Sequence, residues 1–193
     1  MPTPTQLVVG ALDLYLAPEG EAQPADAGTT PAGNWALLGT AGDEDYGEEG
    51  VKVVSEQTIN DFHTLGSTGA VKATRSRESL MISMVLHDML PAQVSLAWNA
   101  NAVTDAGDFD WFGTRKGTVV QTRGVWAVSS GTISPAGAFK IAWYIPKASN
   151  VANVEIVYNK DTLNAVRCEW KAYEYRSAST AAERFGRLIV DEA

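Results

Sequence analysis

Cysteine is almost missing from this 193-residue chain, in which Cys168 is the only one. A single cysteine excludes an intrachain disulfide, so nothing implies an oxidising compartment. Histidine is nearly as scarce, since His63 and His87 are the only two. A zinc site needs three or four ligands at fixed spacing, and the sequence has no such spacing. We therefore interpret the histidines as strand residues and Cys168 as a small, inert core residue, and we expect no cofactor.

Long apolar runs and an excess of cations are also missing. No run approaches the roughly 20 residues of a membrane helix, and the opening MPTPTQLVVG lacks the basic region of a signal peptide. With 15 Lys and Arg against 23 Asp and Glu, the formal net charge is -8. That charge disfavours a grip on nucleic acid and docking on an anionic membrane. We expect a protein made inside the cell that has no membrane partner.

No Lys or Arg precedes Lys52, whereas carboxylates crowd that part of the chain. The loop at 40–50 alone holds Asp43, Glu44, Asp45, Glu48 and Glu49. Like charges so close in sequence repel one another and disfavour a compact state. An EF-hand calcium loop does not explain them, because counting from Asp43 puts Gly47 at the fifth position and Glu48 at the sixth. An irregular cation site and a solvated loop stay open as alternatives.

The chain does have a clear period of two in its apolar residues, which is typical of half-buried strands. In LDLYLA (12–17), three leucines alternate with Asp13 and Tyr15. A Pro- and Gly-rich loop follows at 18–33. Further strands are predicted at 35–40, 118–129, 138–145 (ended by Pro146), 153–159, 163–176 and 184–191. The fold class is therefore mainly β, a β-sandwich or barrel-like single domain over 1–193.

Residues 51–87 predict a long β-hairpin that turns at the STG following Gly66. Each of its strands exceeds the usual length of about 5–6 residues. Most of the hairpin is polar on both faces, and only its last part has a one-sided apolar pattern, formed by Leu80, Ile82, Met84 and Leu86. The hairpin therefore projects beyond the core of its own domain, and something else must cover it.

One short helix is predicted at 88–99. Asp88 is positioned to cap it, and Pro91 falls in the first turn, where proline is tolerated. Leu90, Val94, Ala97 and Trp98 would share its apolar face.

No catalytic constellation is recognisable, because the chain has no glycine-rich phosphate loop, no G-x-S-x-G and no H-E-x-x-H. The stretch DFDWFGTRKG (108–117) groups aromatic residues beside Arg115 and Lys116, which would suit stacking on bases. Since the overall charge is negative, we favour a hairpin that packs its aromatics on the core or on a neighbouring subunit. We do not expect an enzyme.

Several stretches follow one another in a familiar order. DLYLAPEGEAQPAD is followed by NWALLGTAGDEDYGEEGVKV, by INDFHTLGSTGAVKATRSRESLMISMVLHDM and by a helix ending in SLAWNAN. Over roughly residues 11–101 this order resembles the major tail tube proteins of long, non-contractile-tailed bacteriophages and of related gene transfer agents. The remainder shares only the general β pattern.

The resemblance implies a β-sandwich or barrel with one flanking helix, of which six copies close into a ring. Rings stack into a hollow tube through which DNA leaves the capsid. The implied partners are further copies of the chain and the tape measure, tail terminator and distal tail proteins, whereas genomic DNA passes without specific binding. The implied location is the virion tail, assembled in the cytoplasm of the bacterial host.

Within such a tube, the long hairpin would complete a barrel across subunits, with one face towards the lumen. Acidic residues on its polar part are the lumen candidates: Glu56, Asp61 and Glu78. The resemblance also implies that the loop at 40–50 contacts the adjacent ring. Its carboxylates would meet cations there, for which the candidates are Arg75, Arg77, Arg115 and Lys116.

A protein of another class remains as the alternative. A β-sandwich recognition module, such as a capsid decoration or glycan-binding protein, would account for the strands and the aromatics. It leaves the long polar hairpin unexplained.

Overall fold

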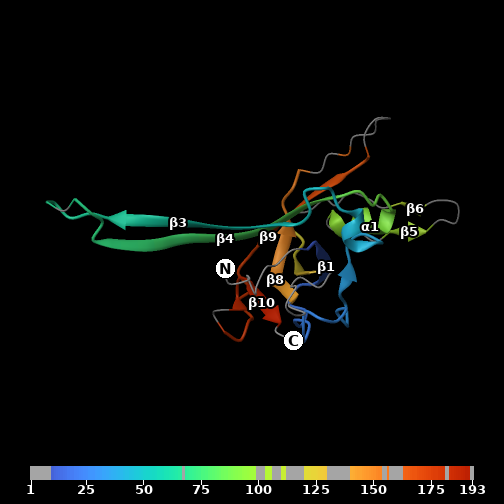
Figure 1. The fold of residues 1–193 in the computed structure, drawn as a ribbon, viewed down its shortest axis with the longest axis horizontal. Coiled ribbons are helices and arrows are strands. Elements are labelled where there is room, and N and C mark those ends of the chain that lie inside the picture. Colours follow the sequence, from blue (N-terminus) through green and yellow to red (C-terminus); the bar gives the residue numbers. More distant parts are fainter. Residues whose placement is uncertain are drawn as a thin grey trace, which may run out of the picture.

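Antiparallel strand pairing organises the structure, a computed structural model that describes residues 10–66, 68–98, 103–105, 110–111, 120–129, 140–153, 156, 163–180 and 183–191. Eight strands form one sheet in the order β2-β1-β7-β8-β9-β4-β3, with β10 paired to β8 (Figure 1). Its strands are β1 (Leu12–Pro18), β2 (Ala36–Leu37), β3 (Lys52–Phe62), β4 (Lys72–Leu86), β7 (Arg123–Ser129), β8 (Lys140–Asn150), β9 (Val166–Ala172) and β10 (Arg187–Asp191). β5 (Thr104–Asp105) and β6 (Asp110–Trp111) pair separately. The predicted mainly β fold is confirmed.

The alternation along the strands divides the apolar residues between the two faces of this sheet. On β1, Leu14 and Leu16 enter the main core, while Tyr15 and Ala17 belong to a second cluster on the opposite face. The main core also takes the apolar residues that β4 and β9 turn inward, such as Ile82 and Trp170. Tyr46, which is hydrogen-bonded to Leu14 of β1, also forms a bridge with Leu86 of β4, so β1 and β4 approach each other beside this core. The sheet is thus curled round one apolar interior.

The second apolar cluster is covered by the segment between β1 and β2, which includes the predicted loop at 18–33. Trp35 packs edge-on against Tyr144, with ring centroids 6.3 Å apart. The Trp35 indole donates a hydrogen bond to the Ala22 carbonyl (3.1 Å), and the Tyr144 hydroxyl donates one to the Glu21 carbonyl (2.8 Å). This segment therefore covers the second cluster.

The prediction that Pro146 ends a strand is wrong, because β8 continues to Asn150. Register with β7 shifts between Arg123 and Val125, which is where Pro146 lies on the facing strand. On its other side, β8 pairs with β10 up to Tyr144 and with β9 from Ala148. Proline is tolerated at such an irregularity because no ladder bond needs its missing N–H.

Other predicted strands are shorter than expected. The strand predicted at 35–40 retains only β2, that at 118–129 only β7, and that at 163–176 only β9. β7 begins and ends opposite the two ends of β1, since a strand needs a neighbour to bond with. The strand predicted at 184–191 is confirmed as β10, which pairs with β8. Most of the strand predicted at 153–159 lies outside the described residues.

The long hairpin is confirmed as β3 and β4, but its turn is not tight. The connection runs over 63–71, and the Val71 amide donates a hydrogen bond to the Phe62 carbonyl at 2.8 Å. β9 pairs with β4 only from Met81 to Leu86. Residues 55–80, which we call the arm, extend past that pairing and project from the body (Figure 1). The part of β4 beyond β9, residues 72–80, corresponds to about 30 Å of strand.

The helix α1 runs from Pro91 to Ala97 and is shorter than predicted. Leu90 is its N-cap, with φ -59 and ψ 135. A residue before proline is pushed out of the helical region, so the helix cannot start earlier. Asp88 is not the cap, and the Leu90 side chain is 54% exposed instead of facing the core. Among the described residues no helix is long and apolar enough to cross a membrane.

Candidate self-assembly surface

The arm is a two-stranded ribbon with two open edges. Within the described residues, β3 pairs only with β4, and residues 72–80 of β4 pair only with β3. All side chains of residues 55–62 are exposed. Unpaired backbone N–H and C=O groups on such edges are a template for pairing with another chain, and an isolated ribbon is marginal in water. Of the surfaces that the described residues form, the arm therefore offers the open strand edges to which another chain could add.

The three lumen candidates do not share one face of the arm. Leu80 faces the core and pairs with Ser55, so Ser55 and every second residue along β3 from it lie on the core-side face. Asp61 belongs to this set, and so does Glu78, two residues from Leu80. Glu56 pairs with Ser79 and lies on the opposite face. A bore bounded by one face of the ribbon can therefore contain only part of the predicted set.

The two faces also differ in charge. The cations Lys52, Lys72 and Arg77 lie on the same face as Glu56. Lys52 is an even number of residues from Glu56 along β3, and so are Phe62 and Thr58, the β3 partners of Lys72 and Arg77. Asp61 and Glu78 share theirs with one cation, Arg75, which pairs with Ile59. Only the Asp61 face carries a net negative charge, so only that face matches the expected repulsion of phosphates.

A bulge decides which residues meet on the arm. Register shifts between Thr58 and Ile59, leaving Ser76 as an extra residue on β4. Residues three apart on a regular strand point to opposite faces, but this extra residue brings Arg75 and Glu78 together as an ion pair. Both side chains are about half exposed, so the pair adds little stability. A predicted lumen acid is thus the partner of a predicted inter-ring cation.

The acidic loop is a folded element anchored by a buried tyrosine. Tyr46, only 8% exposed, donates a hydrogen bond to the Leu38 carbonyl (2.6 Å) and accepts one from the Leu14 amide (3.1 Å). Burial raises the pKa of Tyr46 well above its ordinary value. A 3-10 helix, η1 (Gly42–Asp45), precedes it, and the Asp45 carboxylate accepts a hydrogen bond from the Ala41 amide (2.7 Å). The alternative of a merely solvated loop does not describe this segment.

The loop is also tied to the start of α1 and to the end of β4. The Asp88 carboxylate accepts hydrogen bonds from the amide and hydroxyl of Thr40 and from the Leu90 amide. Burial acts to raise the pKa of Asp88, but these hydrogen bonds outweigh it and leave that pKa below its ordinary value. The His87 amide donates to the Asp45 carbonyl at 2.8 Å. The loop is therefore hydrogen-bonded both to the start of α1 and to the residue that follows β4.

Asp13 supports the loop from β1. Its carboxylate accepts a hydrogen bond from the Asp43 amide at 3.0 Å. Burial raises the pKa of Asp13, although this hydrogen bond acts in the opposite direction. Gly42 lies against the same carboxylate with a φ of +65, and a Cβ there would be 2.4 Å from the Asp13 Oδ1. Neither Asp13 nor Tyr46 is predicted as an anchor by the sequence; the one signal is a period of two that leaves Asp13 on the second face of β1.

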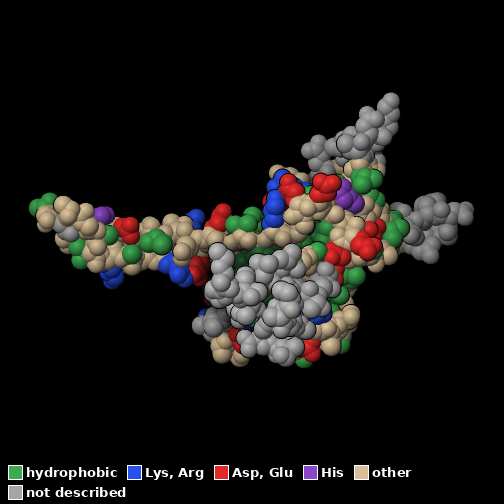
Figure 2. Space-filling model, viewed as in Figure 1, with side chains coloured by type: hydrophobic (Ala, Val, Ile, Leu, Met, Phe, Trp, Pro, Cys, Tyr) green, Lys and Arg blue, Asp and Glu red, His purple; other side chains and the backbone are tan. Residues whose placement is uncertain are grey.

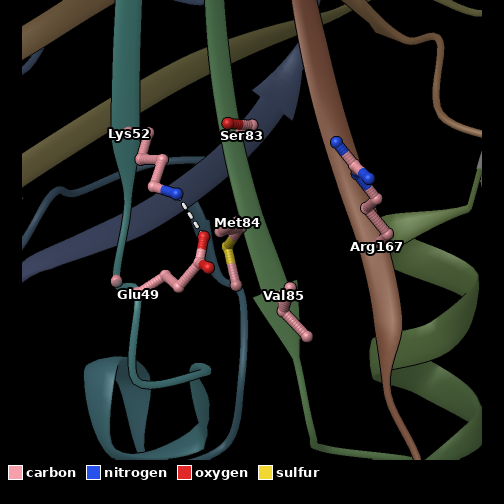
Figure 3. A pocket seen from close by; sticks show the side chains of 7 residues that line it. Glu49, Lys52, Ser83, Met84, Val85 and Arg167 are labelled. Carbon is pink, nitrogen blue, oxygen red and sulfur yellow. Dashed lines mark hydrogen bonds and ion pairs between the residues drawn. The ribbon is translucent and has the colours of Figure 1, made fainter.

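A cavity of about 280 Å³ lies at the base of the arm and is lined by Glu49, Gly50, Lys52, Ser83, Met84, Val85 and Arg167 (Figure 3). Lys52 is paired with Glu49, and its hydrogen bond lowers the pKa of that carboxyl. Arg167 is paired with Glu169 at 2.7 Å. Both cations are thus already neutralised, and the cavity offers no strong site for an anion. Among the described residues, no three His, Cys, Asp or Glu side chains are grouped to hold a metal.

The remaining sequence-predicted residues are dispersed. Arg115 and Lys116 lie outside the described residues. Cys168 is buried in the main core, as predicted, and burial raises its pKa to about 12. The histidines are not strand residues, since His63 lies in the arm's connection and His87 directly follows β4. His87 Nδ1 is 3.1 Å from the Asn164 carbonyl oxygen.

No protein-family model matches this chain, and no curated protein matches it in sequence. The functional interpretation therefore depends on the geometry of the arm and of the acidic loop.

Proposed function

We propose that this chain is a structural subunit that assembles into stacked, hexameric rings and forms the tail tube of a phage-like particle. The observation that carries the proposal is the arm, an exposed ribbon whose two strand edges lack partners in the described part of the chain. Pairing arms side by side between copies satisfies both edges, and closure into a barrel leaves none exposed. The resemblance of residues 11–101 to tail tube proteins supports the same assembly.

The tube serves as a conduit for DNA, which passes along the bore without being bound. Cations on the wall would bind phosphates and hinder sliding, so the bore requires a face with net negative charge. On the arm this is the face of Asp61 and Glu78. Screening limits the reach of each charge to about 8–10 Å at physiological salt, so groups on the other face matter little to DNA. Tape measure, terminator and distal tail proteins are the partners inside the tube and at its ends.

Electron microscopy of the purified protein tests this proposal. The full-length chain is expected to form rings or tubes in negative stain. A control variant in which residues 57–78 are replaced by Asn-Gly joins Glu56 to Ser79 through a two-residue turn and keeps the core strands. That variant should stay monomeric with unchanged circular dichroism. Monodisperse monomers from the full-length chain would contradict the proposal and favour the alternative, a β-sandwich recognition module in capsid decoration or glycan binding.

A further inference from the structure

The arm ends in three large apolar side chains that its own body does not cover. Phe62 is 53% exposed, Val71 is 62% exposed, and Leu65 is fully exposed at 108%. The hydrogen bond from the Val71 amide to the Phe62 carbonyl holds the first two beside each other. Single exposed apolar residues are common on surfaces, but a group at the far end of an arm is typical of a contact site.

Cations outnumber carboxylates around this group, although Asp61 and Glu78 flank it and Glu78 is paired with Arg75. Residues 62–77, which we call the tip, contain Lys72, Arg75 and Arg77 and no carboxylate. Residues 10–51 show the reverse, with nine carboxylates and no Lys or Arg. The chain therefore carries a basic, apolar tip and a strongly acidic segment.

The tip and the acidic loop lie towards opposite ends of the molecule. Figure 1 shows η1 and α1 on the side of the body that faces away from the tip. In Figure 2, acidic side chains gather on that side of the body, while the arm carries both Lys or Arg and Asp or Glu side chains. We call the surface formed by η1, Asp88 and Leu90 the acidic end. It also has an apolar centre, because the Leu90 side chain is 54% exposed beside the Asp88 carboxylate.

We propose that the tip of one copy docks on the acidic end of a second copy in the next ring. Leu65 and Phe62 pack on Leu90, and Lys72 and Arg77 face the carboxylates of η1. The two surfaces differ and lie at opposite ends, so the contact is head-to-tail and repeats without limit along one axis. Each contact is small, and stacking becomes stable because a ring makes several at once.

This inference rests on the proposed function, since it takes the second copy to belong to the adjacent ring, and its test separates the two. Leu65→Asp blocks the tip and Leu90→Asp blocks the acidic end, while the arm's edges stay intact. Leu163→Asp is the matched control, because Leu163 is 77% exposed and belongs to neither surface. We expect single rings from the first two variants and wild-type tubes from the control. Full-length tubes from either blocked variant would overturn the inference, as would loss of rings together with tubes in a folded Leu65→Asp protein.

Mixing provides the second readout. Rings of Leu65→Asp retain an intact acidic end, and rings of Leu90→Asp retain intact tips. When the two preformed rings are mixed, head-to-tail docking predicts stacks of two rings and no longer ones. A mixture that remains single rings contradicts the docking even if each variant alone behaves as expected.

Disulfide capture distinguishes a wrong contact from a wrong assembly. Chains carrying Leu65→Cys and chains carrying Leu90→Cys should form a mixed disulfide under mild oxidation, whereas Leu65→Cys with Leu163→Cys should not. Capture without rings would leave the head-to-tail contact standing and remove the ring proposal. Rings or tubes without disulfide capture would support the ring proposal and contradict the head-to-tail contact.

Discussion

The hydroxyl of Tyr46 lies 2.6 Å from the carbonyl oxygen of Leu38 and 3.1 Å from the amide nitrogen of Leu14. One side chain thus joins the acidic loop to β1 and to the residue that follows β2. The carboxylates of this loop repel one another, so the loop depends on such anchors to keep a single shape. A fixed acidic surface can recognise a partner without first becoming ordered.

Tyr46→Phe is expected to destabilise the fold by about 1–3 kcal/mol, because it leaves a buried amide and a buried carbonyl without their shared partner. Urea unfolding followed by circular dichroism measures this change. Tyr173→Phe is the control, since Tyr173 is 36% exposed, and it should change stability by less than about 0.5 kcal/mol. Equal midpoints for the two variants would show that the buried hydroxyl contributes nothing.

Two glycines separate backbone strain from a steric clash. Gly50 has a φ of +63, and a Cβ added there would have no atom within 4 Å, so Gly50→Ala should cost only about 1–2 kcal/mol for the left-handed conformation. Gly42 has a similar φ of +65 but would place its methyl 2.4 Å from the Asp13 Oδ1. Gly42→Ala should therefore be clearly more destabilising in thermal unfolding. Similar losses for both would mean that the Asp13 contact is relieved without cost.

Cys168 should resist thiol reagents in the folded protein. Burial raises its pKa from the ordinary 9.0 to about 12, so the reactive thiolate is scarce near pH 8. We expect no reaction with a disulfide reagent in buffer and one equivalent in urea. The pKa of the Cys168 thiol is higher in the folded protein than in the unfolded one. The contribution of this thiol to the free energy of unfolding is therefore complete below about pH 9 and is lost between pH 9 and 12. Rapid native labelling near pH 8 would contradict the buried placement.

Exposed carboxylates of the acidic loop should set tube length. Glu44 and Glu48 are exposed, so Glu44→Gln with Glu48→Gln removes charge without disturbing the Tyr46 anchor. Tubes of this double variant are expected to be shorter at low salt in electron micrographs. Wild-type tubes should shorten similarly at about 1 M salt, where the screening length is only about 3 Å. Glu174→Gln, outside the acidic end, should leave the length unchanged; salt-independent wild-type lengths would argue against charge pairing.

The two faces of the arm predict opposite effects of charge reversal. If the Asp61 face lines the bore, tubes of Asp61→Lys should retain short duplex DNA, because a cation then contacts the phosphates. Tubes of Glu56→Lys should not retain it, since Glu56 lies on the other face. Binding of labelled DNA to sedimented tubes compares them at equal assembly. The reverse pattern would place the bore on the Glu56 face and contradict our choice.

Much of the architecture was accessible from local patterns. The alternation of Leu80, Ile82, Met84 and Leu86 correctly predicted the buried end of the hairpin, because the period of a strand depends only on neighbours in sequence. The excess polar length of the hairpin predicted the arm. In contrast, the faces of Asp61 and Glu56 could not be assigned, since face follows from register and register is a relation between strands.

The sequence by itself determined that the chain is mainly β, that its carboxylates gather ahead of Lys52 and that one hairpin exceeds its core. These properties are sums over local preferences and charges. Only the tertiary structure decided that β8 continues past Pro146, that the bulge joins Arg75 to Glu78, and that Tyr46 fixes the acidic loop. Each of these depends on a partner remote in sequence, whose position no local pattern encodes.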